Sequence, residues 1–218
     1  MQPFVVAAYN RVVDDAYRLP DLGRSSTLGI LIGNTRALWD RFVLALRADP
    51  RACDDPNPLD RYVGAAVSRA LLPLSHRIEV RFAHEPPPRR VAMQRLAHLA
   101  GLAYLSQSHL CVHATFGPWI ALRAVVVVDA DGPLDPPPEP QSPCRDCEGD
   151  CMPRFRQAVA LAGARGDPTT IERHWEHWLA VRDACPVGRA YRYGDEQIRY
   201  HYAKDRAGLM RLLVRTAP

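Results

Sequence analysis

The strongest constraint on the fold is a nearly continuous apolar run from Trp119 to Asp129, with the sequence WIALRAVVVVD. Its β-branched residues favour a strand, and because polar residues hardly interrupt it, both faces of that strand should be buried. Gly117 and Pro118 precede the run and predict a bend in the chain. The sequence therefore predicts a central strand in a layered core, with His113 and Trp119 flanking the bend near a pocket.

Composition places the chain among ordinary globular proteins. It has 218 residues, of which 47% are hydrophobic and 24% charged, and we expect one domain over residues 1–218. No apolar run approaches the roughly 20 residues that a membrane-spanning helix needs, and the first residues do not resemble a signal peptide. The net charge is +4, with arginines dispersed among acidic residues. We therefore expect a cytoplasmic protein that binds neither nucleic acid nor membrane.

Periodicity predicts helices interleaved with strands, followed by a helical C-terminal part. Strands are expected at Thr27–Gly33 and Arg77–Ala83, besides the central one. Residues 133–143 are rich in proline and should form an extended linker to the C-terminal part. The pattern is typical of an α+β fold, a sheet layered with helices. The predicted helices are Phe4–Tyr17, Arg36–Leu46 with a cap at Asn34-Thr35, Leu59–Leu72, Val91–Gln107, Phe155–Ala164, Thr170–Ala184 and Gln197–Val214.

Several motifs, in order along the chain, resemble the CblC family, the methylmalonic aciduria and homocystinuria type C family. Residues 26–42, 88–105 and 174–206 follow the family pattern around the most specific motif. The resemblance implies a nitroreductase-like α+β fold, with a layered antiparallel or mixed sheet, flanking helices and a helical C-terminal part. The specific motif consists of Cys111, His113, Phe116, Gly117, Trp119, Ala121 and Arg123.

The resemblance implies that His113, Phe116, Gly117 and Trp119 bind cobalamin, and no residue is expected to form a covalent intermediate. An imidazole could hydrogen-bond the corrin side chains or lie near cobalt, and axial ligation stays open. The glycine would let the backbone approach a flat macrocycle, and the aromatic residues would form an apolar wall. From the residues alone, turn formation and core packing explain the Phe-Gly-Trp set equally well. Pro118 departs from the family pattern, which has a second glycine there.

Arginines of the C-terminal half form a second candidate set. The planar guanidinium group is suited to clamping carboxylates or phosphates. The resemblance implies that this region binds glutathione, or another thiol in its place, and lines a pocket where reduced flavin also binds. Each of these arginines could instead be a solvated surface residue. The set consists of Arg154, Arg156, Arg182 and Arg192.

Cysteines after the linker depart most from the family. Cys144, Cys147 and Cys151 form C-x2-C-x3-C at residues 144–151, and Cys185 precedes Pro186. Such short spacing indicates metal binding or redox chemistry more than a structural disulfide. Four thiolates could hold zinc or a 4Fe–4S cluster, and free or reversibly oxidised thiols are the alternative.

The function implied by the resemblance is cobalamin processing: base-off binding, then removal of the upper axial ligand by reductive decyanation or by thiol-dependent dealkylation. A reduced flavin or a partner flavin reductase would supply electrons, and an acceptor protein would receive the product. One alternative is a cobalamin-dependent reductase whose iron–sulfur cluster feeds electrons to bound cobalamin. The other is a non-enzymatic cobalamin chaperone with structural zinc.

Overall fold

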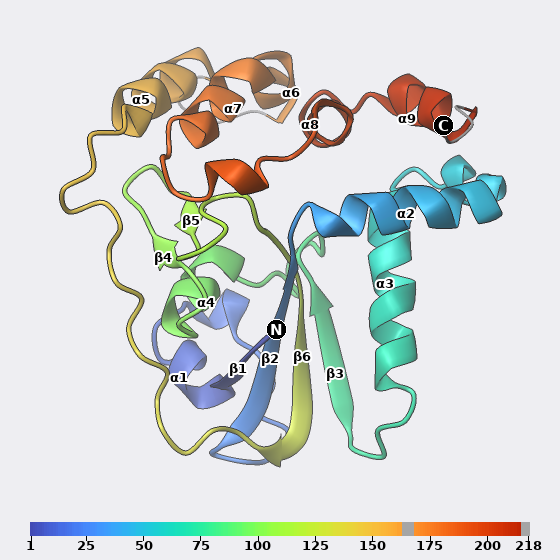
Figure 1. Ribbon diagram of the computed structural model, residues 1–218. Coiled ribbons are helices and arrows are strands. Elements are labelled where there is room, and N and C mark those ends of the chain that lie inside the picture. The colour runs from blue at the N-terminus through green and yellow to red at the C-terminus, as the bar shows by residue number, and fades with distance from the viewer. Residues whose placement is uncertain (163–167, 215–218) are drawn as a thin grey trace.

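A four-stranded sheet forms the centre of the molecule (Figure 1). The structure is a computed structural model and describes residues 1–162 and 168–214. The strand order is β1-β2-β6-β3, and each neighbouring pair is antiparallel. The predicted central strand is confirmed as β6, which pairs with β2 on one side and β3 on the other. Nitroreductase-like layering stays a prediction. The strands are β1 (Gln2–Val5), β2 (Thr27–Asn34), β3 (Ile78–Phe82) and β6 (Ala121–Asp131).

The uninterrupted apolar run of β6 is explained by cores on both faces of the sheet. Val125 and Val127 point into one cluster, which contains residues of α1 (Val6–Asn10) and α4 (Met93–Leu99). Val126 and Val128 point into a second cluster, together with residues of two further helices. Successive residues of a strand face opposite sides, so both sets must be apolar. The further helices are α2 (Ala37–Ala48) and α3 (Pro58–Leu71), and 3-10 turns span Asp15–Tyr17, Pro50–Asp54 and Arg189–Tyr191.

The predicted helix Phe4–Tyr17 is wrong. Residues Gln2–Val5 form the edge strand β1, and α1 has only five residues. Phe4 pairs with Gly29 of β2, and its ring fills the space above that glycine, where an added Cβ would lie 2.2 Å from the ring. The apolar residues of this segment are buried partly in the sheet and partly in α1, so their helical spacing did not indicate one continuous helix.

The predicted helix Val91–Gln107 is also too long. Helix α4 ends at Leu99, and Gly101 then takes a left-handed φ of +73°. Two short strands follow, β4 (Tyr104–Leu105) and β5 (Cys111–Val112), which pair with each other. The proline-rich segment 133–143 contains no helix or strand, as predicted, and it crosses Gly101, where an added Cβ would lie 2.9 Å from the carbonyl oxygen of Pro138.

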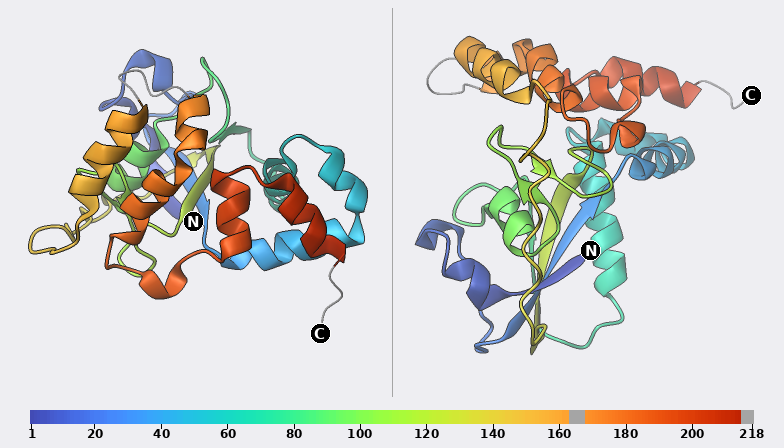
Figure 2. Two further views of the ribbon diagram at one scale, coloured as in Figure 1. Left: turned by 90° about the horizontal axis from the view of Figure 1, so that it is seen from above. Right: turned by 60° about the vertical axis from the view of Figure 1, so that its left-hand side comes forward.

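The C-terminal helices lie together across the end of the sheet where β2 passes into α2 (Figure 2). Two predicted helices are each divided, at His174 and at Lys204, which has a positive φ of +53°. The last two residues of the predicted helix Phe155–Ala164 lie outside the described residues. None of the described helices is long and apolar enough to cross a membrane. These helices are α5 (Cys151–Ala162), α6 (Pro168–Arg173), α7 (Trp175–Asp183), α8 (Asp195–Tyr202) and α9 (Arg206–Val214).

Candidate functional site

A pocket of about 400 Å³ lies where β2 passes into α2 and the loop before β6 meets them. His113 and Phe116, two of the four predicted cobalamin-binding residues, line it. Its volume is in the range of small-molecule sites, and its wall is largely apolar with a few polar groups, as such sites usually are. The other lining residues are Met1, Gly33, Asn34, Thr35, Ala37, Leu38, Arg41, Leu102, Ile120 and Leu122.

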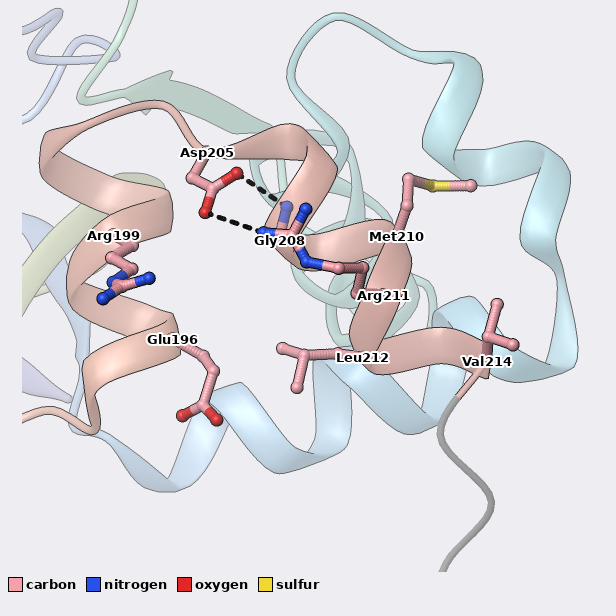
Figure 3. Close-up of a pocket in the computed structure, with 8 residues that line it drawn as sticks. All are labelled: Glu196, Arg199, Asp205, Gly208, Met210, Arg211, Leu212 and Val214. Atoms are coloured by element: carbon pink, nitrogen blue, oxygen red, sulfur yellow. Dashed lines mark hydrogen bonds and ion pairs between the residues drawn. The ribbon is translucent and has the colours of Figure 1, made fainter.

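A larger hollow, of about 730 Å³, lies between α8 and α9 (Figure 3). Asp205 accepts a hydrogen bond from the Gly208 amide at 2.6 Å and pairs with Arg211 at 3.6 Å across its rim. None of the predicted site residues lines this hollow. We therefore take the smaller pocket, which two of the predicted residues line, as the candidate site.

His113 is held in one orientation by its own loop. Its amide and carbonyl exchange hydrogen bonds with those of Gly117, at 2.9 and 2.8 Å. Its Nδ1 accepts hydrogen bonds from the backbone amides of Thr115, at 3.0 Å, and Phe116, at 3.3 Å. Burial, with the positive N-terminal amino group, lowers the pKa of His113, so the ring is neutral at neutral pH.

The tautomer of His113 follows from these bonds. Because Nδ1 accepts, the proton of the neutral ring is on Nε2, which is left as a donor for a ligand. A histidine that ligates a metal normally donates a proton from its other ring nitrogen, and here that nitrogen accepts two bonds instead. The geometry thus favours hydrogen bonding over cobalt ligation, a choice that the sequence left open.

Gly117 lies where two segments of the chain approach each other closely. Its φ is +55°, and a Cβ added there would lie 1.9 Å from the carbonyl oxygen of Val187. The backbone that approaches this glycine is therefore the chain's own segment Val187-Gly188, and Gly117 is buried beneath it. Packing explains why position 117 has no side chain, and an approach of Gly117 to a macrocycle stays a prediction.

Trp119 is only 1% exposed and does not line the pocket. Its ring packs edge-on against Tyr193, with centroids 5.4 Å apart, and the Arg182 guanidinium lies 5.0 Å from its centroid. Core packing, the alternative interpretation, describes this residue, and direct contact between Trp119 and cobalamin stays a prediction.

The predicted arginines divide into two pairs. Arg182 is mostly buried and donates hydrogen bonds to the carbonyl oxygens of Pro118, at 2.8 Å, and Ile120, at 2.9 Å. These bonds support the loop before β6 and engage the Arg182 guanidinium group with the protein's own backbone. Arg192 pairs with Asp183 at 2.7 Å. Both arginines therefore already have internal partners where the sequence predicted ligand binding.

Arg154 and Arg156 are both exposed on α5. Arg154 pairs with Asp150 at 2.8 Å, an exposed ion pair that contributes little to stability. These two arginines are the more exposed members of the set.

The described residues contain no group of three or more His, Cys, Asp or Glu side chains already placed to hold a metal ion. All six cysteines are unpaired thiols. Cys53 and Cys111 belong to the two core clusters, as expected of small apolar residues. Burial raises the pKa of Cys111 to about 12, so its thiol is unreactive.

The pocket wall formed by the end of β2 and the start of α2 was not predicted as part of the site. Asn34 and Thr35 were expected to cap α2, but no side-chain cap bond forms. Instead Asn34 Oδ1 accepts a hydrogen bond from Arg123 Nε at 2.6 Å, which ties β2 to β6. A signal was available, since residues 26–42 follow the family pattern, but an apolar strand and helix carry no chemistry by themselves.

The comparisons with known proteins identify the family. A sequence model of the methylmalonic aciduria and homocystinuria type C family matches residues 1–212. The chain belongs to this family. The human cyanocobalamin reductase / alkylcobalamin dealkylase is 31% identical over 220 residues, covering 91% of this chain and 70% of the human protein. The Danio rerio protein of the same name is 25% identical, covering 91% and 80%.

A solved structure supports the fold. The C. elegans B12-trafficking protein CblC, described as a homologue of human MMACHC, aligns with a TM-score of 0.71 and 18% identity, covering 100% of this chain and 90% of that one. The family resemblance predicted from the motifs is thus confirmed. In this chain the carbonyl of Pro118 accepts a hydrogen bond from Arg182, and Pro118 has no amide proton to offer a ligand.

Proposed function

We propose that this chain binds cobalamin at the pocket of His113 and Phe116 and removes its upper axial ligand. The observation that carries the proposal is the convergence of these two motif residues on one pocket, in a chain that matches the family over residues 1–212. The named relatives are cyanocobalamin reductases and alkylcobalamin dealkylases.

The pocket can enclose only part of a molecule as large as cobalamin. We infer that the upper face of the corrin, with its axial ligand, packs against Phe116, Ile120 and Leu122, which supply the apolar wall. The Nε2–H of His113 would donate to an amide carbonyl at the corrin edge. The ring of Phe116 itself packs edge-on against Tyr191, with centroids 4.8 Å apart.

Binding with the nucleotide base displaced from cobalt would make the upper ligand easier to remove. For cyanocobalamin, one electron from a reduced flavin or a partner flavin reductase takes Co(III) to Co(II), and cyanide leaves with its electron pair. For an alkylcobalamin, a thiolate such as that of glutathione attacks the alkyl carbon. A thioether forms, and both electrons of the cobalt–carbon bond stay on cobalt as Co(I). The protein's part is to bind, orient and exclude water.

Arg154 and Arg156 are our candidates for holding the carboxylates of that thiol. They are exposed and lie on α5, in the helical layer above the sheet (Figure 2). Arg182 and Arg192 would act indirectly, by supporting the loop and the C-terminal layer.

The test is an anaerobic visible spectrum of the full chain with cyanocobalamin, followed by reduced flavin, and in parallel with methylcobalamin and glutathione. We expect a base-off spectrum, then cob(II)alamin in the first case and cob(I)alamin in the second. Binding without any change at cobalt would indicate a chaperone. Absence of affinity for every cobalamin would refute the proposal.

His113→Ala tests the assigned pocket. Loss of one hydrogen-bond donor to the ligand should weaken cobalamin binding by about 1 kcal/mol, roughly fivefold, or somewhat more. The matched control is His84→Ala, because His84 is an exposed histidine that does not line the pocket. Equal affinities for the two variants would place cobalamin elsewhere.

A further inference from the structure

Two separate segments that carry four cysteines pack together where the start of α5 meets the end of α7. We propose that Cys144, Cys147, Cys151 and Cys185 form a tetrathiolate site for a soft metal centre, either a single Zn²⁺ or an iron–sulfur cluster. Cys144, Cys147 and Cys151 lie within one eight-residue segment, and the loop of that segment packs on the turn that carries Cys185. Thiolates are the ligands that select such centres.

Contacts at Gly149 show how closely the two segments pack. A Cβ added to Gly149 would lie 2.9 Å from the carbonyl oxygen of Ala184 and 3.2 Å from both Cys147 Sγ and Pro186 Cδ. The loop that carries Cys147 is therefore pressed directly on the turn that carries Cys185. A larger residue at position 149 would push the two apart.

One of the sulfurs has a local hydrogen bond. The amide of Gly149, two residues after the cysteine, donates to Cys147 Sγ at 3.3 Å. Such a bond orients the sulfur, which is the part that outer groups play around a bound metal.

Cys144 is exposed, while the other three cysteines of the set are partly buried. No group of three potential ligands is already in place among the described residues, so binding must draw the sulfurs together. Four thiols would each release a proton as they ligate the metal, and affinity should therefore rise with pH. Cys53 and Cys111, in the two core clusters, take no part.

The site would be linked to the proposed cobalamin loop. Two residues after Cys185, Val187 lies over Gly117, and a Cβ added to Gly188 would lie 2.2 Å from the backbone carbon of Phe116. A metal held by Cys185 would fix this segment, and with it the loop that presents Phe116 to the pocket.

The test is the metal content of the full chain, purified without air and analysed for zinc, iron and acid-labile sulfide. One zinc per chain, or iron and sulfide with a visible charge-transfer band, would support the site and identify its occupant. In a zinc form, exchange for Co²⁺ should give the intense absorption of tetrahedral cobalt–thiolate coordination. Substoichiometric metal, both as purified and after reconstitution with Zn²⁺ or with iron and sulfide, would refute the proposal. So would a disulfide within the set in protein kept from air.

Variants locate the ligands. Cys144→Ser and Cys185→Ser should each abolish stoichiometric metal binding, while Cys53→Ala should keep it. Since Cys144 is exposed, its replacement leaves the fold intact and separates lost ligation from misfolding. Metal retained by Cys144→Ser at full occupancy would overturn the four-cysteine assignment. None of these measurements needs cobalamin, so their outcome is independent of the proposed function.

Discussion

Replacing Gly117 by alanine should destabilise the protein markedly. The residue has a φ of +55°, a left-handed conformation that costs an L-residue with a side chain about 1–2 kcal/mol. The new Cβ would also lie 1.9 Å from the carbonyl oxygen of Val187 and 2.6 Å from its carbonyl carbon, so the backbone of that segment must move. Forced overpacking of this kind typically costs about 1–3 kcal/mol.

Together these effects predict a loss of about 2–5 kcal/mol in the free energy of unfolding, or roughly 4–20 °C in Tm for a chain of this size. Gly64→Ala is the matched control. Gly64 lies inside α3, and a Cβ there meets only Phe82 at 3.9 Å, so alanine should stabilise the helix by about 0.5–1 kcal/mol. Urea unfolding followed by circular dichroism measures both. If Gly117→Ala were as stable as the parent, the packing of Val187 on the loop would be wrong.

Three further outcomes are expected. Arg182→Met leaves the carbonyl of Pro118 unpaired and removes a cation–π contact, so it should lower the free energy of unfolding by about 2–4 kcal/mol. Arg156→Ala, the control, should lower it by less than about 0.5 kcal/mol, and urea unfolding measures both. Burial, with Arg123 and Arg182 nearby, lowers the pKa of His201 to about 3, whereas the unfolded chain takes up this proton near pH 6.5. The free energy of unfolding should therefore fall by about 1.4 kcal/mol per pH unit as the pH drops from 6.5 to 3. His201→Phe should flatten that part of the acid-unfolding curve. The Cys111 thiol, with its pKa raised to about 12, should resist a thiol reagent at pH 8 in folded protein and react once urea is added, and labelling before unfolding would contradict its burial.

Much of the architecture follows from local patterns. The run VVVV in β6 needs apolar residues on both faces, and the cores around Val125 and Val126 provide them. Helix lengths were predicted less well, because Gly101 and Lys204 interrupt apolar patterns that continue through them. Packing and turn geometry decide whether a residue adopts a positive φ, and the spacing of apolar residues along the sequence cannot predict it.

In the candidate site, His113 and Phe116 were predicted and line the pocket, while Trp119 and Arg182 face inward beneath the loop. Residue type cannot distinguish these two outcomes, since an aromatic ring or a guanidinium group suits either a ligand or a core. The pocket wall from α2 went unpredicted for the same reason.

The sequence by itself determined the central strand, the order of the motifs and hence the family, because these depend on residue types at fixed spacing along the chain. Only the tertiary structure decided which arginines are most exposed, which ring nitrogen of His113 is free to donate, and that the turn of Cys185 packs against the cysteine loop more than thirty residues before it. Those properties depend on groups brought together from distant segments, and spacing along the chain does not encode distances between them.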